Sequence, residues 1–443
     1  MKKVKRIMAV LLASLIALAS VGCSSQTSSS SSSASSEESA SAASEQDGEK
    51  TELKFLIVAG NDEMPGWQGI VDSFNAKSED SFITLEQLPG SWSEYIQKLT
   101  ALIAADTAPD IGRVAPTYLP QFIEMDQLVQ MDDYVSELNM EDYYESAFEQ
   151  VKINGKTYGI PVGVYTLVLY YNKAMFDEAG LEYPPMDWEN PWTIEEFQEA
   201  AAALSKGDGA ERQYGFYATS VPERNTGFIY SAGGDIYDED RVYSTFNTEP
   251  VIKTYTMLQD MITAGVSPTP SMVETMPTDQ MFLSNKLAMI IEGQWMMPSF
   301  TKEEDFELGV AAVPKDLTCT TLNFIDQYVI FKSSKNHDKA WEAIRSFIEG
   351  DAEKIMAENG LGGIPVYKPT VEEMRDELFN PLTDEEKDVM FNSIDYSQAL
   401  GVSTTWAEDL DAATKVLDLV MLGNTTVEDG MAQIDSDIAA LRE

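Results

Sequence analysis

The chain has 443 residues, 44% of them hydrophobic, which is enough to fill the cores of two domains. Its 74 acidic and 30 basic residues give a net charge of −44 at pH 7, which excludes nucleic acid and anionic membrane surfaces as partners. The chain has one histidine, His337, and two cysteines, Cys23 and Cys319. This excludes metal sites with several histidines and sites of the CxxC type. A catalytic site that uses histidine could form only around His337. We therefore expect no metal, no cofactor and no catalytic residue.

A basic start followed by an apolar run from Ile7 to Val21 is typical of a secretory signal, and the run is shorter than the ~20 residues of a membrane-spanning helix. The run ends in Ser-Val-Gly-Cys at Cys23, which resembles a bacterial lipobox except for Ser20, where leucine is usual. We expect residues 1–22 to be removed and Cys23 to carry a diacylglycerol; a signal cleaved nearby with Cys23 incidental is the alternative. Residues 23–50 are Ser-rich and predict a disordered tether.

Strands and helices alternate in the next part of the chain. The patterns predict strands at residues 53–60, 81–88 and 110–114, and helices at 65–78, from Ser93 to before Pro109, and at 116–128. This alternation predicts parallel strands in an α/β layer. Because ligands gather at the carboxyl ends of such strands, the candidate site loops are Asn61–Met64, Gly90–Trp92 and Arg113–Thr117.

The middle of the chain begins with a turn at Asn154-Gly155 and an apolar run at 161–171 that is long enough to cross between two lobes. A helix follows at 172–179, and a capping box of Thr193 and Glu196 opens another. Residues 233–247 predict a hairpin, because their acidic turn lacks the glycine and the distal glutamate of a calcium loop. Helices are predicted at 249–265 and 278–287, and a strand at 288–293 that leads into Gln294 and Trp295.

Several segments occur in an order that resembles the extracellular solute-binding proteins of carbohydrate ABC transporters, the group that includes maltose-binding protein. They are APDI, YGIPVGVYTLVLYYNKAMFDEAGL, GGDIYDEDRVYSTFN, MFLSNKLAMIIEGQW, AAVPKD, YVIFKSSKNHDKAWEAIRSFIEG, GIPVYKP and a C-terminal helical pair from Trp406. The resemblance covers nearly all of the chain from Leu53 onward. Its strength lies in the number and order of the segments, since no single one is decisive.

The resemblance implies a fold class of α/β type with two lobes, as in type II periplasmic binding proteins, a three-segment hinge and a ligand cleft between the lobes. Lobe one would comprise residues 51–163 plus 323–364, and lobe two residues 164–322 plus 365–443. The crossing segments map near Val162–Tyr165, Leu322–Asp326 and Gly363–Val366. Closure of the lobes about the hinge would trap the ligand.

Sugars present flat CH faces and many hydroxyls, so a site for them combines aromatic rings with polar side chains. Trp295 aligns with a family position that often stacks on sugar, and Tyr165 falls at the first crossing. The remaining candidates are cleft or strand-end residues: Trp92, Arg113, Asn61, Glu63, Trp406, Asp326 and Trp67, with lower weight on Glu223–Asn225. Core packing is an equal alternative for Trp67, a sheet-facing position for Tyr165, and an ion pair for Arg113. Trp192 and Trp341 fit core or loop packing.

The resemblance implies a monomeric, lipid-anchored protein on the extracellular face of the cell membrane that captures a sugar or oligosaccharide and delivers it to the permease of an ABC importer. It implies no enzyme activity. Three alternatives stay open: a non-sugar solute such as a polyamine, a peptide or a glycerol phosphodiester in the same fold, a sugar-sensing lipoprotein, and a glycan hydrolase that uses two carboxylates.

Overall fold

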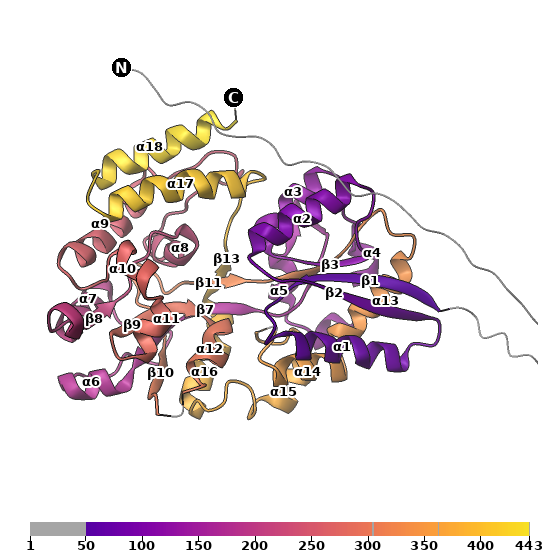
Figure 1. Cartoon of the computed structure of the whole chain (residues 1–443), viewed down its shortest axis with the longest axis horizontal. Coiled ribbons are helices and arrows are strands. Elements are labelled where there is room, and N and C mark those ends of the chain that lie inside the picture. Colours follow the sequence, from indigo (N-terminus) through magenta and orange to yellow (C-terminus); the bar gives the residue numbers. More distant parts are fainter. Residues whose placement is uncertain (1–49, 304, 362, 443) are drawn as a thin grey trace, which may run out of the picture. The chain divides into compact units, whose positions relative to one another are not determined.

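The structure is a computed structural model that describes residues 50–442 except 304 and 362. The predicted signal, the lipidation site at Cys23 and the Ser-rich tether up to residue 49 lie outside the described residues. Two mixed sheets, each covered by helices, make up the described part of the chain (Figure 1).

The first sheet has the strand order β2-β1-β3-β12-β6. Strand β1 pairs in parallel with β2 and β3, so that Phe55 lies between Leu85 and Ile111, whereas β12 runs antiparallel to β3 and β6. These strands are β1 (Thr51–Val58), β2 (Ser81–Leu88), β3 (Ile111–Val114), β6 (Ile160–Pro161) and β12 (Gln327–Ile330).

Alternation along β1 sends side chains to two separate cores, as a strand period of two requires. Phe55 and Ile57 pack in a core with α1, α13 and α14, while Leu56 and Val58 pack in a core with α2 and α3. Figure 1 shows these two groups of helices on opposite faces of the sheet. The helices are α1 (Met64–Lys77), α2 (Trp92–Ala104), α3 (Leu119–Glu124), α13 (His337–Phe347) and α14 (Gly350–Glu358).

Short elements complete this lobe. The turn predicted at Asn154-Gly155 joins the two-residue strands β4 and β5, and both of its residues have positive φ, of 52° and 72°. The remaining elements are the 3-10 helix η1 (Pro116–Tyr118), α4 (Asp132–Val135), η2 (Met140–Asp142), α5 (Glu145–Gln150), β4 (Lys152–Ile153) and β5 (Lys156–Thr157).

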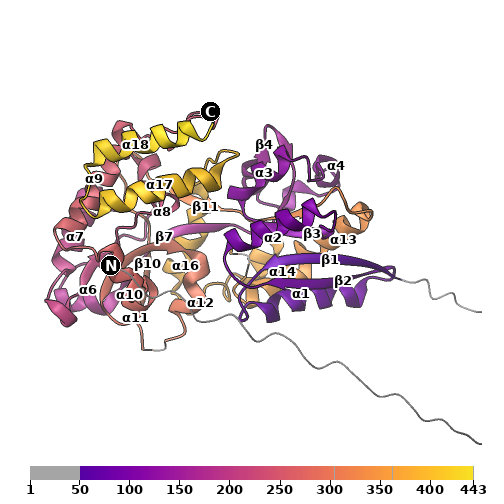
Figure 2. The ribbon, with the colours of Figure 1, turned by 45° about the horizontal axis from the view of Figure 1, so that its top comes forward.

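The second sheet has the order β13-β11-β7-β9-β8, with β10 also pairing with β7. Strand β7 is buried along its whole length and lies at the centre of this lobe (Figure 2). The strands are β7 (Tyr165–Asn172), β8 (Tyr214–Phe216), β9 (Leu287–Gly293), β10 (Leu308–Ala311), β11 (Thr321–Phe324) and β13 (Ser397–Ala399).

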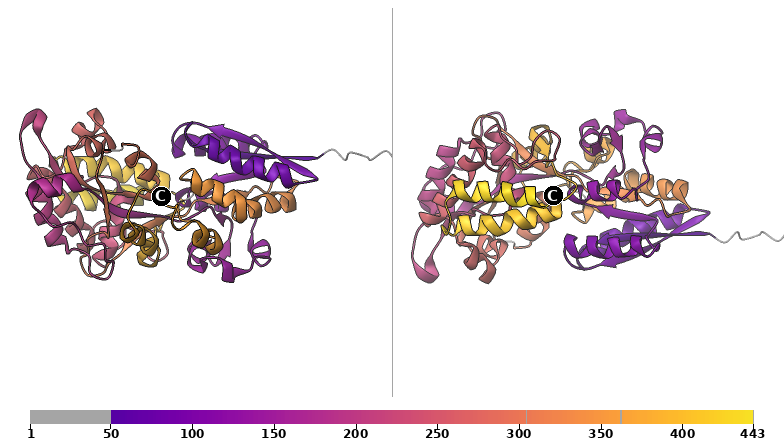
Figure 3. Two further views of the ribbon diagram at one scale, coloured as in Figure 1. Left: turned by 90° about the horizontal axis from the view of Figure 1, so that it is seen from below. Right: turned by 90° about the horizontal axis from the view of Figure 1, so that it is seen from above.

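Helices enclose the second sheet. The predicted capping box of Thr193 and Glu196 is confirmed at α7, and the C-terminal pair α17 and α18 packs on α9 (Figure 3). The elements are α6 (Lys173–Ala179), α7 (Ile194–Leu204), η3 (Gly209–Glu211), α8 (Pro222–Ser231), α9 (Glu249–Thr263), α10 (Pro270–Thr275), α11 (Thr278–Leu283), η4 (Gln294–Met296), α12 (Met297–Phe300), α16 (Asp384–Asn392), η5 (Ser393–Tyr396), α17 (Trp406–Met421) and α18 (Val427–Ala440). The helix α15 (Lys368–Met374) packs in the first lobe instead.

The chain passes between the two sheets at residues 162–164, which separate β6 from β7, and at residues 325–326, which separate β11 from β12. The backbone N–H of Val162 donates to the carbonyl of Asp326 at 2.8 Å, and Val164 exchanges two backbone hydrogen bonds with Ile364 at 2.8 and 2.9 Å. Three chain segments distant in sequence are therefore tied together where the lobes meet.

Residues around α15 pack with the first sheet. Val366, Val371, Met374 and Leu378 pack in the first lobe's core with α1 and α14, although the sequence analysis assigned residues from 365 onward to lobe two. Core packing with the second sheet starts again at Leu382. The apolar face of α15 explains this difference, because it covers α14 and so extends the packing of lobe one.

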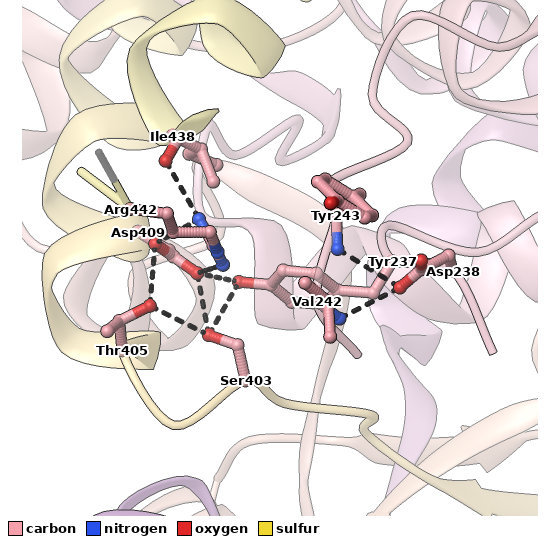
Figure 4. Close-up of polar contacts among 9 residues, drawn as sticks. All are labelled: Tyr237, Asp238, Val242, Tyr243, Ser403, Thr405, Asp409, Ile438 and Arg442. Atoms are coloured by element: carbon pink, nitrogen blue, oxygen red, sulfur yellow. Dashed lines mark hydrogen bonds and ion pairs between the residues drawn. The ribbon is translucent and has the colours of Figure 1, made fainter. Parts of the chain in front are cut away.

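A buried polar cluster fixes the C-terminal helices to the predicted hairpin at 233–247 (Figure 4). Asp409, which is 1% exposed, receives hydrogen bonds from the hydroxyls of Tyr237 and Ser403 at 2.6 Å and from the Arg442 guanidinium at 2.7 Å. In the hairpin itself, the Asp238 carboxylate receives the backbone N–H groups of Val242 and Tyr243. Asp409 thus satisfies buried donors, and Asp238 satisfies amides of the predicted hairpin turn.

Candidate functional site

A cavity of about 630 Å³ lies where the carboxyl ends of β1, β2 and β3 face α8 and η4 of the second lobe, and we call it the central cavity. Its size falls within the range of small-molecule sites. It is lined by Val58, Ala59, Gly60, Glu63, Gly90, Ser91, Trp92, Arg113, Ala115, Pro116, Thr117, Tyr118, Tyr165, Glu223, Arg224, Trp295, Phe324 and Asp326.

All three loops predicted from the strand ends contribute to this lining. The loop after β2 is held by a capping box in which Ser91 receives the N–H of Glu94 at 3.3 Å and the Glu94 carboxylate receives the N–H of Ser91 at 2.9 Å. The helix begins at Trp92, one residue before Ser93 and thus near the predicted start, and this places the indole of Trp92 in its first turn beside the cavity.

Arg113 on β3 lies at the floor of the cavity and is 7% exposed. Its guanidinium lies between two indoles, 5.0 Å from the ring centre of Trp67 and 5.3 Å from that of Trp92, and pairs with the carboxylate of Asp326. Burial raises the pKa of Asp326, and the charge of Arg113 opposes this rise. The pair joins a strand end to the second crossing segment, and its two opposite charges compensate each other in a buried place.

Aromatic rings form the opposite wall. Trp295 makes edge contacts with Tyr165, at 5.7 Å between ring centres, and with Phe324, at 5.5 Å. The guanidinium of Arg224 lies 5.1 Å from the ring centre of Trp295 and pairs with Glu292 at 3.2 Å. A Cβ on Gly293 would lie 2.2 Å from atoms of the Trp295 ring, so only glycine lets this indole pack back against the end of β9.

Two carboxylates complete the polar lining. Glu63 receives the backbone N–H of Gly60 at 2.6 Å, which closes the turn after β1. Glu223 stands in the first turn of α8, and its Oε2 atom is buried without a hydrogen-bond partner. Burial raises the pKa of the Glu223 carboxyl.

Six of the nine residues proposed from the sequence line the central cavity: Trp295, Tyr165, Trp92, Arg113, Glu63 and Asp326. Tyr118 and Phe324 were missed. Tyr118 is one residue beyond the loop predicted after β3, and Phe324 ends a strand on the second crossing, a place where only Asp326 was considered.

The structure places the other three candidates outside the cavity. Trp67 is fully buried, because the guanidinium of Arg113 covers its indole and separates it from the cavity. Trp406 is 3% exposed and packs on Tyr237, because the hydrogen bonds of Asp409 turn the first turn of α17 inward. Asn61 is exposed, and its side chain receives the amide of Gln87 at 3.2 Å.

Several residues considered in the sequence have structural roles. The half-buried Cys319 is a free thiol whose pKa burial raises to about 11, so it is protonated at neutral pH. His337 is the first residue of α13. Trp341 lies in the first lobe's core.

The described residues contain neither a metal-binding cluster nor a membrane-spanning helix. No cluster of three or more His, Cys, Asp or Glu side chains in this part of the chain could hold a metal ion. Within the same residues, no helix has both the length and the apolar character needed to cross a membrane.

Comparison with known proteins matches residues 69–376, well over half of the chain, to the bacterial extracellular solute-binding protein family. A binding protein of Brucella abortus (strain 2308) is 26% identical over 312 residues, which cover 69% of this chain and 73% of that protein. The maltodextrin-binding protein of Bacillus subtilis (strain 168) is 23% identical, with 88% of this chain and 85% of that protein covered.

Among solved structures, an ABC substrate-binding protein of Listeria monocytogenes in complex with cycloalternan superposes with a TM-score of 0.79 at 22% identity. The superposition covers 89% of this chain and 99% of that one. This likeness confirms the predicted fold class of two α/β lobes.

Proposed function

Because the chain belongs to the bacterial extracellular solute-binding proteins, we propose that it binds a sugar or oligosaccharide in the central cavity and delivers it to the permease of an ABC importer. The observation that carries this proposal is the lining of the cavity, in which five aromatic side chains stand among charged side chains. Aromatic faces suit the CH faces of sugar rings, and charged groups form strong hydrogen bonds with hydroxyls.

The proposed ligand contacts come from both lobes. Trp92, Arg113 and Glu63 belong to the first lobe, Trp295 belongs to the second, and Tyr165 and Asp326 stand at the crossing segments. A ligand that touches both lobes binds best when the lobes are close to it, so binding shifts the population toward a closed state. The permease would then recognise that closed state. We propose that the lobes divide near residues 162–164, 325–326 and 379–381.

The names of the relatives support the class of ligand. The Bacillus subtilis relative is a maltodextrin-binding protein, and the Listeria monocytogenes structure holds cycloalternan. For this chain a sugar is the class of ligand that the cavity accommodates, and binding without chemistry is the proposed activity. The protein acts as a monomer in this proposal.

The membrane attachment rests on the sequence. A lipid on Cys23 would hold the protein on the extracellular face of the cell membrane, and the Ser-rich stretch would let the folded part reach the permease. Mass spectrometry of the protein from its native membrane tests this point, since a diacylglycerol on Cys23 adds a defined mass that Cys23→Ser removes.

The ligand is tested by tryptophan fluorescence and thermal shift against monosaccharides, oligosaccharides, polyamines and peptides. A ligand at 100 times its dissociation constant adds about 2.7 kcal/mol to the free energy of unfolding. We expect a saccharide to stabilise the protein, and Trp295→Ala to abolish that effect while Tyr243→Ala, at an exposed position, leaves it unchanged. Stabilisation by polyamines or peptides alone would overturn the ligand class, and release of shorter sugars from a bound glycan would overturn binding without chemistry.

A further inference from the structure

Acidic side chains outnumber basic side chains in the lining of the central cavity. Three acidic residues, Glu63, Glu223 and Asp326, line it with two basic ones, Arg113 and Arg224. Both arginines already have carboxylate partners, Arg113 in Asp326 and Arg224 in Glu292. An incoming anion would therefore meet no cation that is free to receive it among the residues that line this cavity.

Glu223 is the acidic residue of the lining whose carboxylate is not fully hydrogen-bonded within the described residues. Its Oε2 atom is buried and has no hydrogen-bond partner in the described part of the chain. Burial raises the pKa of this carboxyl, and the adjacent charge of Arg224 opposes the rise. The other titratable groups that face it are Tyr118 from the first lobe and Tyr255 from α9, and both are hydroxyls with raised pKa values. Among the described residues, the positive charge that acts on Glu223 is that of Arg224, which is paired with Glu292 and donates no hydrogen bond to Oε2.

Glu63 is the second acidic residue of the lining that forms no ion pair among the described residues. Its Oε2 atom receives the N–H of Gly60, and no ion pair joins Glu63 to a basic residue within the described range. The turn after β1 therefore brings a negative charge to the first-lobe side of the cavity, while Glu223 brings another to the second-lobe side.

A buried carboxylate without a partner is among the costlier features of a protein interior. A sugar hydroxyl can supply one hydrogen bond to it. A protonated amine supplies a hydrogen bond and the compensating charge, and hydrogen bonds between charged groups are roughly twice as strong as neutral ones. The aromatic rings that line the cavity also attract a cation at their faces.

We propose that the central cavity selects a saccharide that carries a protonated amine, with Glu223 as the residue that receives the amine. This inference rests on the proposed function, since it names the class of saccharide that the same cavity takes. It follows that acidic sugars such as uronates and sugar phosphates are rejected, because they would face Glu63 and Glu223 with no free arginine.

The test compares saccharides that differ in one substituent. Glucosamine, N-acetylglucosamine, glucose and glucuronic acid form such a series, and oligomers of glucosamine, N-acetylglucosamine and glucose extend it. Calorimetry on the full protein gives the affinity for each. We expect the amine form to bind at least ten-fold more tightly than the hydroxyl or acetamide form of the same length, and the acid to bind more weakly than either.

Glu223→Gln keeps the shape of the side chain and removes its charge, so it should bring the ratio of amine to neutral affinity close to one. Glu239→Gln, at an exposed position in the hairpin at 233–247, removes the same charge and should keep the ratio.

The outcomes separate the two proposals. A neutral saccharide that binds as tightly as its amine form, in a Trp295-dependent manner, overturns the amine proposal and leaves the proposed function standing. An amine preference that survives in Glu223→Gln also overturns the role of Glu223. If no saccharide of any form binds, both proposals fall.

Discussion

The buried carboxyl of Glu353 should make the stability of the protein depend on pH. It lies on α14, is 2% exposed, and its Oε1 atom receives the N–H of Tyr367 at 3.2 Å, while Oε2 is buried without a partner. Burial raises the pKa of this carboxyl from 4.5 to about 8, and the neighbouring charge of Glu349 adds to the rise. The folded protein therefore holds Glu353 protonated at neutral pH, whereas the unfolded chain ionises it.

A carboxyl whose folded-state pKa is raised stabilises the fold below its unfolded pKa and loses that contribution as the pH rises through the folded value. For Glu353 the window runs from 4.5 to about 8. At about 1.4 kcal/mol for each pH unit, this single group lowers the free energy of unfolding by up to roughly 5 kcal/mol between the two ends. Glu353→Gln removes the titration and adds a pH-independent offset of about 1–3 kcal/mol if the new amide is left unpaired.

The assay is chemical denaturation of the natural protein and of Glu353→Gln at pH 5, 6, 7 and 8. The difference in unfolding free energy should shift in favour of the variant as the pH rises, by about 3–5 kcal/mol over the range. Glu358→Gln, at the exposed end of the same helix, is the matched control and should give a curve parallel to that of the natural protein. Parallel curves for Glu353→Gln would refute the inference that this carboxyl is protonated in the fold.

Three further substitutions test the cavity and the C-terminal cluster. Gly293→Ala should displace the indole of Trp295 and weaken saccharide binding by about ten-fold in calorimetry, because its Cβ would lie 2.2 Å from the ring. Arg113→Met should lower the free energy of unfolding by about 3–5 kcal/mol in urea, because it leaves Asp326 buried without its cation. Asp409→Asn should cost about 2–4 kcal/mol and speed amide hydrogen exchange in α17 and α18, because it weakens four hydrogen-bonded partners.

Each of these has a control. Gly227→Ala adds a Cβ whose nearest neighbour would lie 3.7 Å away, so we expect saccharide binding to stay unchanged. Equal losses of binding for both glycine variants would refute the argument about Trp295.

The double variant Arg113→Met with Asp326→Leu should recover part of the free energy of unfolding. No recovery would contradict a charge effect. Asp411→Asn breaks an exposed pair with Lys415 and should change stability by less than about 1 kcal/mol. A similar small change for Asp409→Asn would refute its structural role.

The sheet edge that borders the central cavity could be predicted from the sequence, because the pattern that identifies a strand lies within a few consecutive residues. Hydrophobic alternation marked β1 and β2, and the carboxyl ends of successive parallel strands must meet at one edge. This reasoning led to Glu63, Trp92 and Arg113, all of which line the cavity. Tyr165 and Asp326 came from the resemblance, which located the crossing segments.

Two of the candidates that lie outside the central cavity are placed there by contacts that a single sequence does not contain. Trp67 and Trp406 lie on amphipathic helices, where an indole serves a core or a cleft equally well. Their direction depends on partners distant in the chain: Arg113 covers Trp67, and the hydrogen bonds of Asp409 hold Trp406 against Tyr237. The sequence likewise did not indicate that residues beyond 364 pack with the first lobe. This packing depends on tertiary contacts between α15 and α14.

Two of the segments that cross between the lobes contribute residues to the central cavity. Tyr165 is the first residue after one crossing, Asp326 is the last residue of another, and both line the cavity. Gly363 has a φ of +67°, and a Cβ there would lie 2.5 Å from the carbonyl of Val164 and 2.8 Å from the ring of Tyr165. Gly363, which lies in the first lobe, therefore packs closely against the first crossing segment at Val164 and Tyr165. Because a ligand changes an equilibrium only through contacts that differ between its states, contacts made at the crossing segments themselves link occupancy to the positions of the lobes.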